Sequence, residues 1–389
     1  DRERVLRELG PGDLLVCSYG VLQQEIEAIA QVQFHTAVLD EAQAIKNAST
    51  LRAKAAFELK ADQRIALTGT PVENHLGELW SILNFVNPGL LGSEREFQQR
   101  FVRPIQRDRD RARAQLLRRL VTPFILRRKK SEVLDDLPEK TVITLRVEPS
   151  AEERALYAAM SEEARERVAR NPQPGQARIQ LFAELMRMRR AACAPSLVLA
   201  DGAPSSSKLT AFEELVQELR DNGHRALVFS QFVDFLSLVR ARLDAMGVAY
   251  QYLDGSSTPA KRSAAVDAFQ RGEGDLFLIS LKAGGFGLNL TAADYVIHLD
   301  PWWNPAVEDQ ASDRAHRIGQ TRPVTIYRLL MQGSIEEKIL ALHASKRELA
   351  DDILEGESRA PFEMDQLLEL LAEAHAPRTA ASSSVPVGR

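Results

Sequence analysis

Two adjacent carboxylates, Asp40 and Glu41, follow a short apolar run and are the first residues that point to chemistry. The run Thr36–Leu39 is predicted to be a buried strand, so the pair would lie at its carboxyl end, where open α/β sheets bind their ligands. An Asp there can hold Mg²⁺, and the next Glu can orient a water molecule for attack on a γ-phosphate. Taken alone, Asp40-Glu41-Ala42-Gln43 is equally consistent with a polar turn in which Asp40 caps a helix.

A second polar string follows the next predicted strand. Strand Arg64–Leu67 ends in Thr68-Gly69-Thr70-Pro71. Adjacent parallel strands would bring both threonine hydroxyls beside the carboxylates, where they could relay the state of a bound phosphate. The alternative is an ordinary tight turn, because Gly and Pro are common turn residues.

A glycine-rich segment follows a predicted strand in the second half of the chain. Strand Leu276–Ile279 leads into Lys282-Ala283-Gly284-Gly285-Phe286-Gly287-Leu288-Asn289. Glycines let the backbone approach a phosphate closely, and amides of the following turn can donate hydrogen bonds to it. By itself the glycine-rich segment is weak evidence for a phosphate-binding site. Its place directly after a predicted strand strengthens that interpretation.

A helix that carries Arg314 and Arg317 is predicted to begin at Pro305, with Asn304 as its N-cap. Arginines three positions apart share one helical face. Because guanidinium groups bind phosphate oxygens in pairs, the two arginines would suit a triphosphate. An arbitrary pair of arginines is more often solvated surface charge. We assign no chemistry to His316, which lies between them.

Four strings together resemble the Swi/Snf-type ATPases, a family of superfamily-two helicases. In the first half they are Asp40-Glu41-Ala42-Gln43-Ala44-Ile45-Lys46-Asn47, Leu67-Thr68-Gly69-Thr70-Pro71-Val72-Glu73-Asn74 and Leu79-Trp80-Ser81-Ile82-Leu83-Asn84-Phe85. In the second half, Gln310-Ala311-Ser312-Asp313-Arg314-Ala315-His316-Arg317-Ile318-Gly319-Gln320 resembles the family's sixth motif. The resemblance extends over about residues 10–350.

The resemblance implies a motor that hydrolyses ATP with Mg²⁺ and translocates along double-stranded DNA. Asp40 would bind the Mg²⁺, and the catalytic residues would be Asp40, Glu41, Gln310, Arg314 and Arg317. Both arginines would reach across the cleft between two lobes. The residues that couple hydrolysis to movement would be Gln43, Thr68, Thr70 and Asp313. The DNA-binding residues would be Ser230, Gln231, Gly255, Ser256, Lys282, Gly284, Gly285, Asn289, Arg127 and Arg128.

Strand-like runs alternate with amphipathic helical stretches, which predicts an α/β fold. By resemblance, it consists of two RecA-like lobes with parallel sheets, the first incomplete, and a helical insertion between them. The predicted strands are 14–17, 36–39, 64–67 and 142–147 in the first region, and 226–229, 249–253, 276–279, 295–299 and 324–329 in the second.

The domain boundaries follow from these elements and from changes in composition. The predicted domains are 1–145 for the first lobe, with the insertion starting at about residue 95, then 146–204 for the rest of the insertion and a linker, 205–355 for the second lobe, and 356–389 for a C-terminal helix and disordered tail.

The net charge and the composition limit which kinds of partner and compartment the sequence favours. The net charge of −4 argues against a uniformly basic nucleic-acid binder, but 103–130 contains eleven Arg or Lys and two Asp. A solvated charged face is the alternative explanation of this run. No apolar run reaches the roughly 18 residues that span a bilayer, so no membrane is expected. Two distant cysteines, Cys17 and Cys193, argue against a disulfide framework and favour the cytoplasm, or the nucleoid in a bacterium.

The sequence contains no Gly-Lys-Thr or Gly-Lys-Ser, the string of the phosphate-binding loop. In the family this loop precedes the Asp-Glu pair, so we expect the chain to be N-terminally truncated and inactive by itself. A non-catalytic DNA-binding or protein-interaction module with a helicase fold is the alternative. A second is an RNA-acting enzyme of the same superfamily. A DNA-bound protein such as RNA polymerase is one candidate for what the motor would move.

Overall fold

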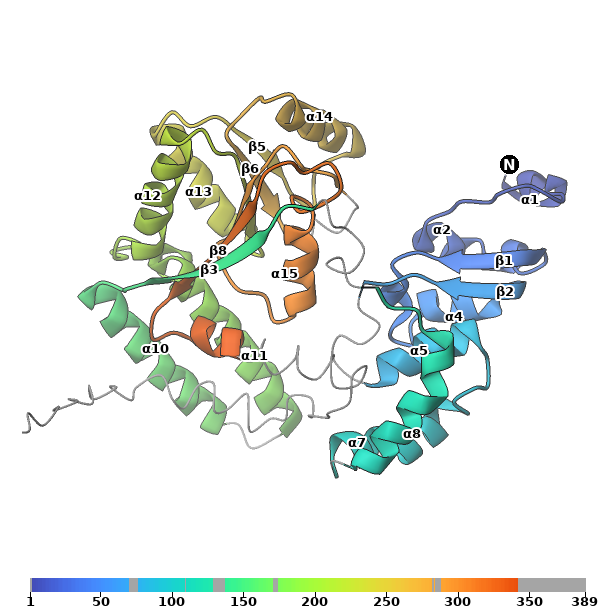
Figure 1. Cartoon of the computed structure of the whole chain (residues 1–389). Coiled ribbons are helices and arrows are strands. Elements are labelled where there is room, and N and C mark those ends of the chain that lie inside the picture. Colours follow the sequence, from blue (N-terminus) through green and yellow to red (C-terminus); the bar gives the residue numbers. More distant parts are fainter. Residues whose placement is uncertain are drawn as a thin grey trace, which may run out of the picture. The chain divides into compact units, whose positions relative to one another are not determined.

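The computed structural model describes residues 2–69, 76–108, 110–128, 137–170, 174–281, 283 and 288–341. Four predicted site residues lie outside these ranges, namely Thr70, Lys282, Gly284 and Gly285. The chain forms two compact units, with the main division between residues 133 and 134 (Figure 1).

The first unit contains a two-stranded parallel sheet of β1 (Gln33–Leu39) and β2 (Lys60–Ala66). Helix α4 (Leu51–Glu58) connects the two strands, because parallel neighbours need a crossover connection. Its buried alanines join β1 side chains in one apolar core. The strands predicted at 36–39 and 64–67 are therefore confirmed, although both begin earlier than expected.

Short helices make up the rest of this unit. They are α1 (Arg2–Glu8), α2 (Tyr19–Gln24), α3 (Ile26–Ile29), η1 (Ala42–Ile45), α5 (Leu76–Val86), α6 (Glu94–Phe97), η2 (Gln98–Val102), α7 (Arg103–Gln106), α8 (Arg111–Val121) and η3 (Thr122–Phe124). Helices α5 to α8 enclose a second apolar core. Within the unit, α7 and α8 lie at the end away from the two strands (Figure 1).

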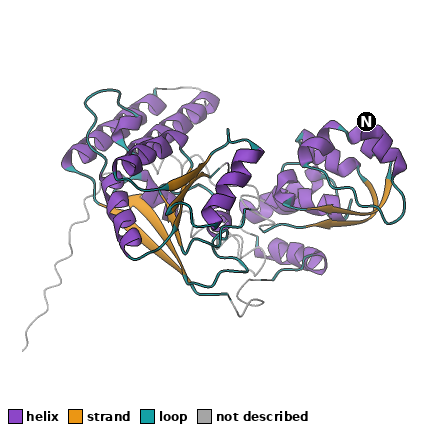
Figure 2. Ribbon diagram, turned by 90° about the horizontal axis from the view of Figure 1, so that it is seen from above, coloured by secondary structure: helices purple, strands orange, loops and turns teal. Residues whose placement is uncertain are grey.

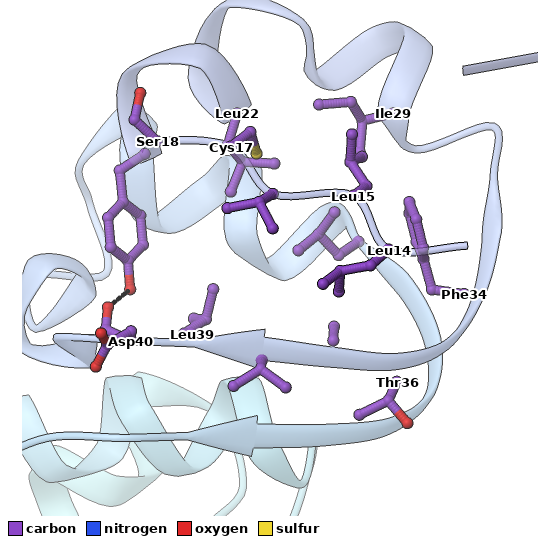
Figure 3. Close-up of a pocket in the computed structure, with 15 residues that line it drawn as sticks. Leu14, Leu15, Cys17, Ser18, Leu22, Ile29, Phe34, Thr36, Leu39 and Asp40 are labelled. Carbon is purple, nitrogen blue, oxygen red and sulfur yellow. Dashed lines mark hydrogen bonds between the residues drawn. The ribbon is translucent and has the colours of Figure 1, made fainter. Parts of the chain in front are cut away.

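The strand predicted at 14–17 is wrong, because this segment has no strand conformation. Leu14 and Val16 are 85% and 80% exposed. The segment and β1 line an apolar cavity of about 420 Å³ (Figure 3). A run of apolar residues becomes a strand only where a neighbouring backbone pairs with it. In the described part of the chain, β1 pairs with β2 and not with this segment.

The second unit contains a six-stranded, all-parallel sheet in the order β3-β8-β7-β4-β6-β5. The strands are β3 (Lys140–Val147), β4 (Ala226–Ser230), β5 (Tyr250–Leu253), β6 (Leu276–Ser280), β7 (Tyr295–His298) and β8 (Val324–Met331). The five strands predicted in the second region are confirmed within two residues at each end. Strands β4 and β6 are buried throughout, as parallel strands covered on both faces must be.

The strand predicted at 142–147 exists, but its assignment to the first region is wrong. As β3, it pairs with β8 from Lys140↔Val324 to Val147↔Met331. The two helices that follow it, α10 (Ala151–Ala169) and α11 (Pro174–Cys193), share an apolar core with the end of β8 and with helical residues 335–341. The helical stretch expected at about 95–200 is thus divided by a strand of the second sheet.

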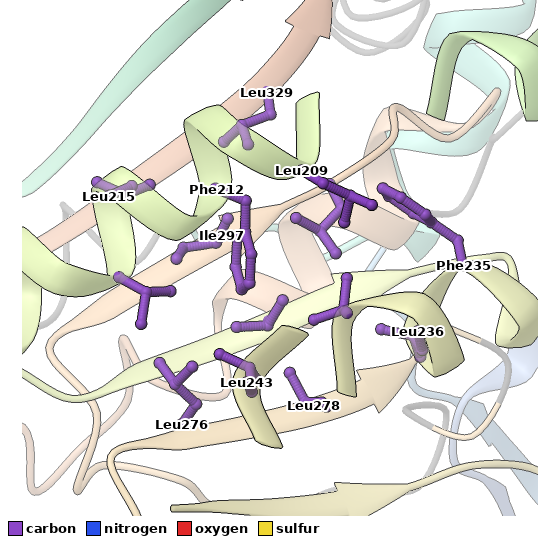
Figure 4. Close-up of a cluster of buried hydrophobic side chains, with 14 of the residues drawn as sticks. Leu209, Phe212, Leu215, Phe235, Leu236, Leu243, Leu276, Leu278, Ile297 and Leu329 are labelled. Atoms are coloured by element: carbon purple, nitrogen blue, oxygen red, sulfur yellow. The ribbon is translucent and has the colours of Figure 1, made fainter. Parts of the chain in front are cut away.

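Helices cover both faces of the six-stranded sheet (Figure 2). On one face, α12 (Ser207–Asp221) and α13 (Val233–Ala245) pack against alternate residues of β4, β6 and β7 (Figure 4). On the other face lie α14 (Pro259–Gln270) and α15 (Pro305–Ser312). Side chains alternate because successive residues of a strand point to opposite faces. No helix within the described ranges is both long enough and apolar enough to cross a bilayer.

Candidate functional site

Asp40 and Glu41 follow directly on β1, at its carboxyl end. The Asp40 Oδ1 atom accepts a hydrogen bond from the Glu41 amide at 2.9 Å. The hydroxyl of Tyr19 donates to the carbonyl of Asp40 at 2.8 Å (Figure 3). Both carboxylate residues are exposed to solvent. The site therefore holds the Asp40 backbone in place while its side chain stays accessible to a ligand.

Glu41 has a left-handed backbone conformation, with φ 49° and ψ 51°. Among the described residues it is the only non-glycine with a positive φ. Such a conformation is strained for an L-residue and persists only where its surroundings hold it. Hydrogen bonds from the Ala42 amide to Leu67 and from the Leu67 amide to Leu39, both 2.8 Å, hold the chain on either side. Strain of this kind gathers at functional sites.

A chain of side-chain hydrogen bonds links the ends of the two strands. Gln43 Nε2 donates to Glu41 Oε2 at 2.6 Å, and Thr68 Oγ1 donates to Gln43 Oε1 at 2.9 Å. Because β1 and β2 are adjacent and parallel, Thr68 lies at the same edge as Glu41, and Gln43 bridges the two side chains. A change at Glu41 can therefore reach the end of β2 through one glutamine.

Sequence reasoning missed Tyr19. Burial, followed by the nearby charge of Asp40, raises the pKa of its hydroxyl to about 12, so it stays a hydrogen-bond donor at neutral pH. The guanidinium carbon of Arg52 lies 5.9 Å from the centre of its ring. No spacing pattern relates Tyr19 to Asp40, since their contact depends on how α2 packs beside β1.

The carboxylates at the end of β1 suit Mg²⁺, which needs few protein ligands, better than a metal ion whose ligands all come from protein side chains. Within the described ranges, no group of three or more His, Cys, Asp or Glu side chains comes together. Mg²⁺ is commonly bound through one or two carboxylates, with phosphate oxygens and water completing the shell. Asp40 offers an exposed carboxylate of this kind.

In the second unit, helix α15 begins as predicted. It starts at Pro305, and Asn304 Oδ1 accepts the amide of Ala306 at 3.1 Å. The helix ends at Ser312, however, so the prediction that Arg314 and Arg317 share one helical face is wrong.

Beyond Ser312 the chain turns more tightly, since the Arg314 amide donates to the carbonyl of Ala311 at 3.3 Å and the Ala315 amide donates to the carbonyl of Ser312 at 3.1 Å. The Ser312 hydroxyl donates to the carbonyl of Glu308 at 2.9 Å, and the Arg314 carbonyl accepts the amide of Leu290 at 3.0 Å. The two arginines then differ in environment. Arg314 is 5% exposed, whereas Arg317 is exposed to solvent.

The turns that carry the arginines are firmly anchored. Gln320 Nε2 donates to the carbonyls of Ala293 at 2.8 Å and Ala315 at 3.0 Å. His316 Nε2 lies 2.7 Å from the carbonyl of Pro138. These contacts fix the backbone around Arg317, so its exposed guanidinium projects from a rigid support.

The other predicted residues of this motif occupy intermediate positions. Gln310 lies on α15 and is half-buried. Asp313 lies 3.6 Å from Lys140 at the start of β3. The motif is therefore tied to the strand that the sequence had assigned to the other region.

Ser230 and Gln231, predicted to contact DNA, are buried at the end of β4. The Ser230 hydroxyl donates to the carboxylate of Asp300. The backbone amide of Gln231 donates to both carboxylate oxygens of Asp300 at 3.3 Å. Burial raises the pKa of Asp300, with the charge of Arg189 opposing that rise. Ser230 thus has an internal partner, and a direct phosphate contact would require that bond to open.

Arg189 of α11 is a second residue that the sequence did not reveal. It is fully buried, and its Nη2 donates to the carbonyl of Pro301 at 2.5 Å. Its guanidinium carbon lies 5.5, 5.9 and 5.1 Å from the ring centres of Phe232, Trp302 and Trp303. Arg189 thereby fixes the segment that leads into α15.

The remaining predicted contacts are accessible. Gly255 and Ser256 are exposed in a turn where Ser256 donates to Asp254 through its amide at 2.9 Å and its hydroxyl at 2.7 Å. These bonds lower the pKa of Asp254, the hydroxyl bond most of all. The other exposed predicted residues are Asn289, Arg127 and Arg128.

Two family models match the chain. The SNF2-related domain matches residues 6–197, and the helicase conserved C-terminal domain matches residues 207–319. YwqA of Bacillus subtilis, whose name marks it as a candidate ATP-dependent helicase/translocase, is 40% identical over 374 residues, covering 93% of this chain and 40% of that protein. The TATA-binding protein-associated factor MOT1 of Saccharomyces cerevisiae is 33% identical, covering 93% of this chain and 23% of that protein.

A solved structure also matches. The SWI2/SNF2 ATPase core of Sulfolobus solfataricus in complex with dsDNA is 36% identical, with a TM-score of 0.49, covering 86% of this chain and 72% of that one. The chain spans less than half the length of the two curated relatives.

Proposed function

Since the chain belongs to the SNF2-type family of helicase-related ATPases, we propose that it forms the core of a motor that hydrolyses ATP to translocate along double-stranded DNA. The observation that carries this proposal is the hydrogen-bonded chain from Glu41 through Gln43 to Thr68 at the ends of β1 and β2. These hydrogen bonds connect the predicted catalytic carboxylate of Glu41 to Thr68, which follows the neighbouring strand β2.

Each residue of the first unit then has a role. Asp40 would hold Mg²⁺, which neutralises charge on the phosphates when bound. Glu41 would orient the attacking water, and its strained backbone would keep that geometry fixed. Gln43 and Thr68 would transmit the change at Glu41 to DNA-contacting segments. Thr70, outside the described ranges, would assist them.

Arg314 and Arg317 would act on the transferring phosphoryl group. Guanidinium groups stabilise the negative charge that builds there in the transition state. The exposed Arg317 suits this role most directly, whereas the buried Arg314 would also support the turns. Gln310 and Asp313 would complete the motif.

Duplex DNA is the proposed partner, and a DNA-bound protein such as RNA polymerase is the proposed obstacle to be moved. The predicted contacts, apart from Arg and Lys, are Gly, Ser, Gln and Asn, which suit the sugar-phosphate backbone. The DNA-binding set also includes Lys282, Gly284 and Gly285, outside the described ranges.

We predict that the purified 389-residue chain hydrolyses ATP negligibly, with or without duplex DNA, because it has no Gly-Lys-Thr or Gly-Lys-Ser to cradle the triphosphate. The full-length gene product should hydrolyse ATP and be stimulated by duplex DNA. Steady-state phosphate release from both polypeptides is the measurement. Robust turnover by the chain itself would contradict the prediction, and a full-length product unresponsive to DNA would leave the non-catalytic module as the better assignment.

We also predict that the chain binds duplex DNA weakly and without sequence preference, and that binding falls steeply with salt. Phosphate contacts release counterions and read no bases. Fluorescence anisotropy with several unrelated duplexes over a salt series would measure this. One duplex preferred at physiological salt, confirmed by footprinting, would show that base-reading contacts exist.

A further inference from the structure

A run rich in arginine lies on the helical end of the first unit, away from the two strands (Figure 1). The described part of 103–128 contains eight arginines and two aspartates, Asp108 and Asp110. The Asp110 carboxylate is already engaged, because it caps α8 by accepting the Arg113 amide at 3.0 Å. Capping leaves the charge of Asp110 in place, so the described part of this run carries a net charge of +6.

The fold turns these arginines outward. Helix α8 buries Leu117 and Val121 in the apolar core it shares with α5, α6 and α7. Arg111, Gln115 and Arg119 are spaced four residues apart, so they form one stripe turned away from that core, and all three are exposed. Helices α7 and α8 contact each other, and the exposed residues Arg103 and Arg107 belong to the same end.

These arginines differ from those elsewhere in the chain. Over the described ranges, Arg103, Arg107, Arg111 and Arg119 form no ion pair. Around α10 the pattern is the opposite. Arg154, Arg165 and Arg170 lie 3.2, 3.1 and 2.7 Å from the carboxylates of Glu148, Glu162 and Glu166. The arginines around α10 are neutralised locally, whereas those of α7 and α8 present their charge to solvent.

We propose that the exposed arginines of α7 and α8, centred on Arg107, Arg111 and Arg119, form a second binding surface for the phosphate backbone of duplex DNA. This surface is separate from the family motifs. The inference rests on the proposed function for the identity of the polyanion as duplex DNA.

The chemistry favours phosphates over an acidic protein. Guanidinium groups bind phosphate oxygens in pairs, and the α8 stripe itself consists of Arg111, Gln115 and Arg119. The exposed apolar side chain beside it on α8 is Leu116, which at 37% exposure offers a protein partner only a small anchor. From Arg111 to Arg119 the helix rises about 12 Å, a length of duplex that carries about seven phosphate charges. One helix face can therefore meet several phosphates at once.

The test compares two triple variants of the 389-residue chain. The surface variant combines Arg107→Gln, Arg111→Gln and Arg119→Gln, and the control variant combines Arg154→Gln, Arg165→Gln and Arg170→Gln. Both lose three positive charges from the same net charge of −4, so any difference reflects position. Binding to a fluorescent mixed-sequence duplex is followed by anisotropy over a salt series without nucleotide, and thermal melting checks that both variants fold.

We expect the surface variant to bind about one to two orders of magnitude more weakly at low salt. Its slope of log affinity against log salt should be shallower by about 2 to 3, because each lost phosphate contact removes about 0.9. The control variant should keep nearly the slope of the unmodified chain.

Equal affinities and slopes for the two variants would overturn the inference without bearing on ATP hydrolysis. Failure of the unmodified chain to bind the duplex at low salt would also overturn it and would favour an acidic protein as the partner. Conversely, a clear difference between the variants, together with DNA-independent turnover by the full-length product, would sustain this surface and defeat the proposed motor function.

Discussion

Replacing Arg317 with alanine in the full-length gene product is expected to lower ATP turnover about 10³-fold or more, the scale typical of an arginine finger. Folding and DNA binding should remain nearly unchanged. Arg317 is exposed, so its side chain contributes little to packing. The surrounding turns are held by Gln320 and His316 instead, through bonds that the substitution leaves intact. Steady-state ATPase at saturating duplex, alongside nucleotide affinity, is the measurement.

Two further variants sharpen this test. Arg317→Lys should restore little activity, because an ammonium cannot reproduce the planar guanidinium fork. Glu41→Gln should also abolish turnover but keep ATP binding, since it removes the activation of water and leaves the Asp40 carboxylate available for Mg²⁺. If Arg317→Ala kept more than about a tenth of the turnover, the finger role would be wrong.

The second large effect is expected on stability, at a buried ion pair of the second unit. Lys208 of α12 lies 2.6 Å from both carboxylate oxygens of Glu336, and the two side chains are 2% and 0% exposed. The Lys208 ammonium also donates to the carbonyl of Leu299 at 3.1 Å, and Glu336 accepts the amide of Met331 at 2.8 Å. The pair therefore joins α12 to the ends of β7 and β8.

Lys208→Met is expected to lower the free energy of unfolding of this unit by about 3–5 kcal/mol, because it leaves Glu336 buried without a counter-charge. The double variant Lys208→Met with Glu336→Met should lose less than the single variant, since no charge then remains buried. Urea unfolding followed by circular dichroism is the measurement. A double variant less stable than the single one would show that the uncompensated charge is not the cause.

The pH dependence gives an independent check. Burial raises the pKa of Glu336, and Lys208 opposes that rise only in part. Without Lys208, the pKa of the Glu336 carboxyl in the folded protein should rise further above its unfolded value. A carboxyl whose pKa is raised by folding stabilises the protein at acidic pH, and this contribution is lost as the pH increases. The defect of Lys208→Met should therefore shrink at acidic pH. Arg170→Ala, at an exposed pair, serves as a control that should barely change the unfolding midpoint.

The sequence by itself determined the local elements and the chemistry they carry. Apolar β-branched runs predicted the five strands of the second region and placed Asp40 and Glu41 at the end of a strand. The prediction that this strand is buried was wrong, because Val38 of β1 is 52% exposed. Pro305 and Asn304 predicted the start of α15. These features depend on neighbouring residues, on backbone preferences and on side-chain alternation, so they can be read without a fold.

The tertiary structure alone decided which elements meet. The apolar run at 14–17 forms no strand, and β3 joins β8 across nearly 180 residues of sequence, because pairing depends on which backbone edge is available. Helix α15 stops at Ser312, and beyond it the carbonyl of Arg314 accepts the amide of Leu290 from a distant part of the chain. Periodicity describes one segment at a time, so it could not foresee these long-range hydrogen bonds.

The same limit applies to the residues that support the site. Tyr19 reaches Asp40 only after α2 has packed beside β1, and Arg189 reaches the carbonyl of Pro301 only after α11 has packed against a segment more than 100 residues later in the chain. The sequence therefore determined which side chains are present at the ends of the strands. Tertiary packing decided which of them are exposed, as Arg317 is, and which are enclosed, as Ser230 and Arg314 are, because burial depends on what the rest of the chain places above each residue.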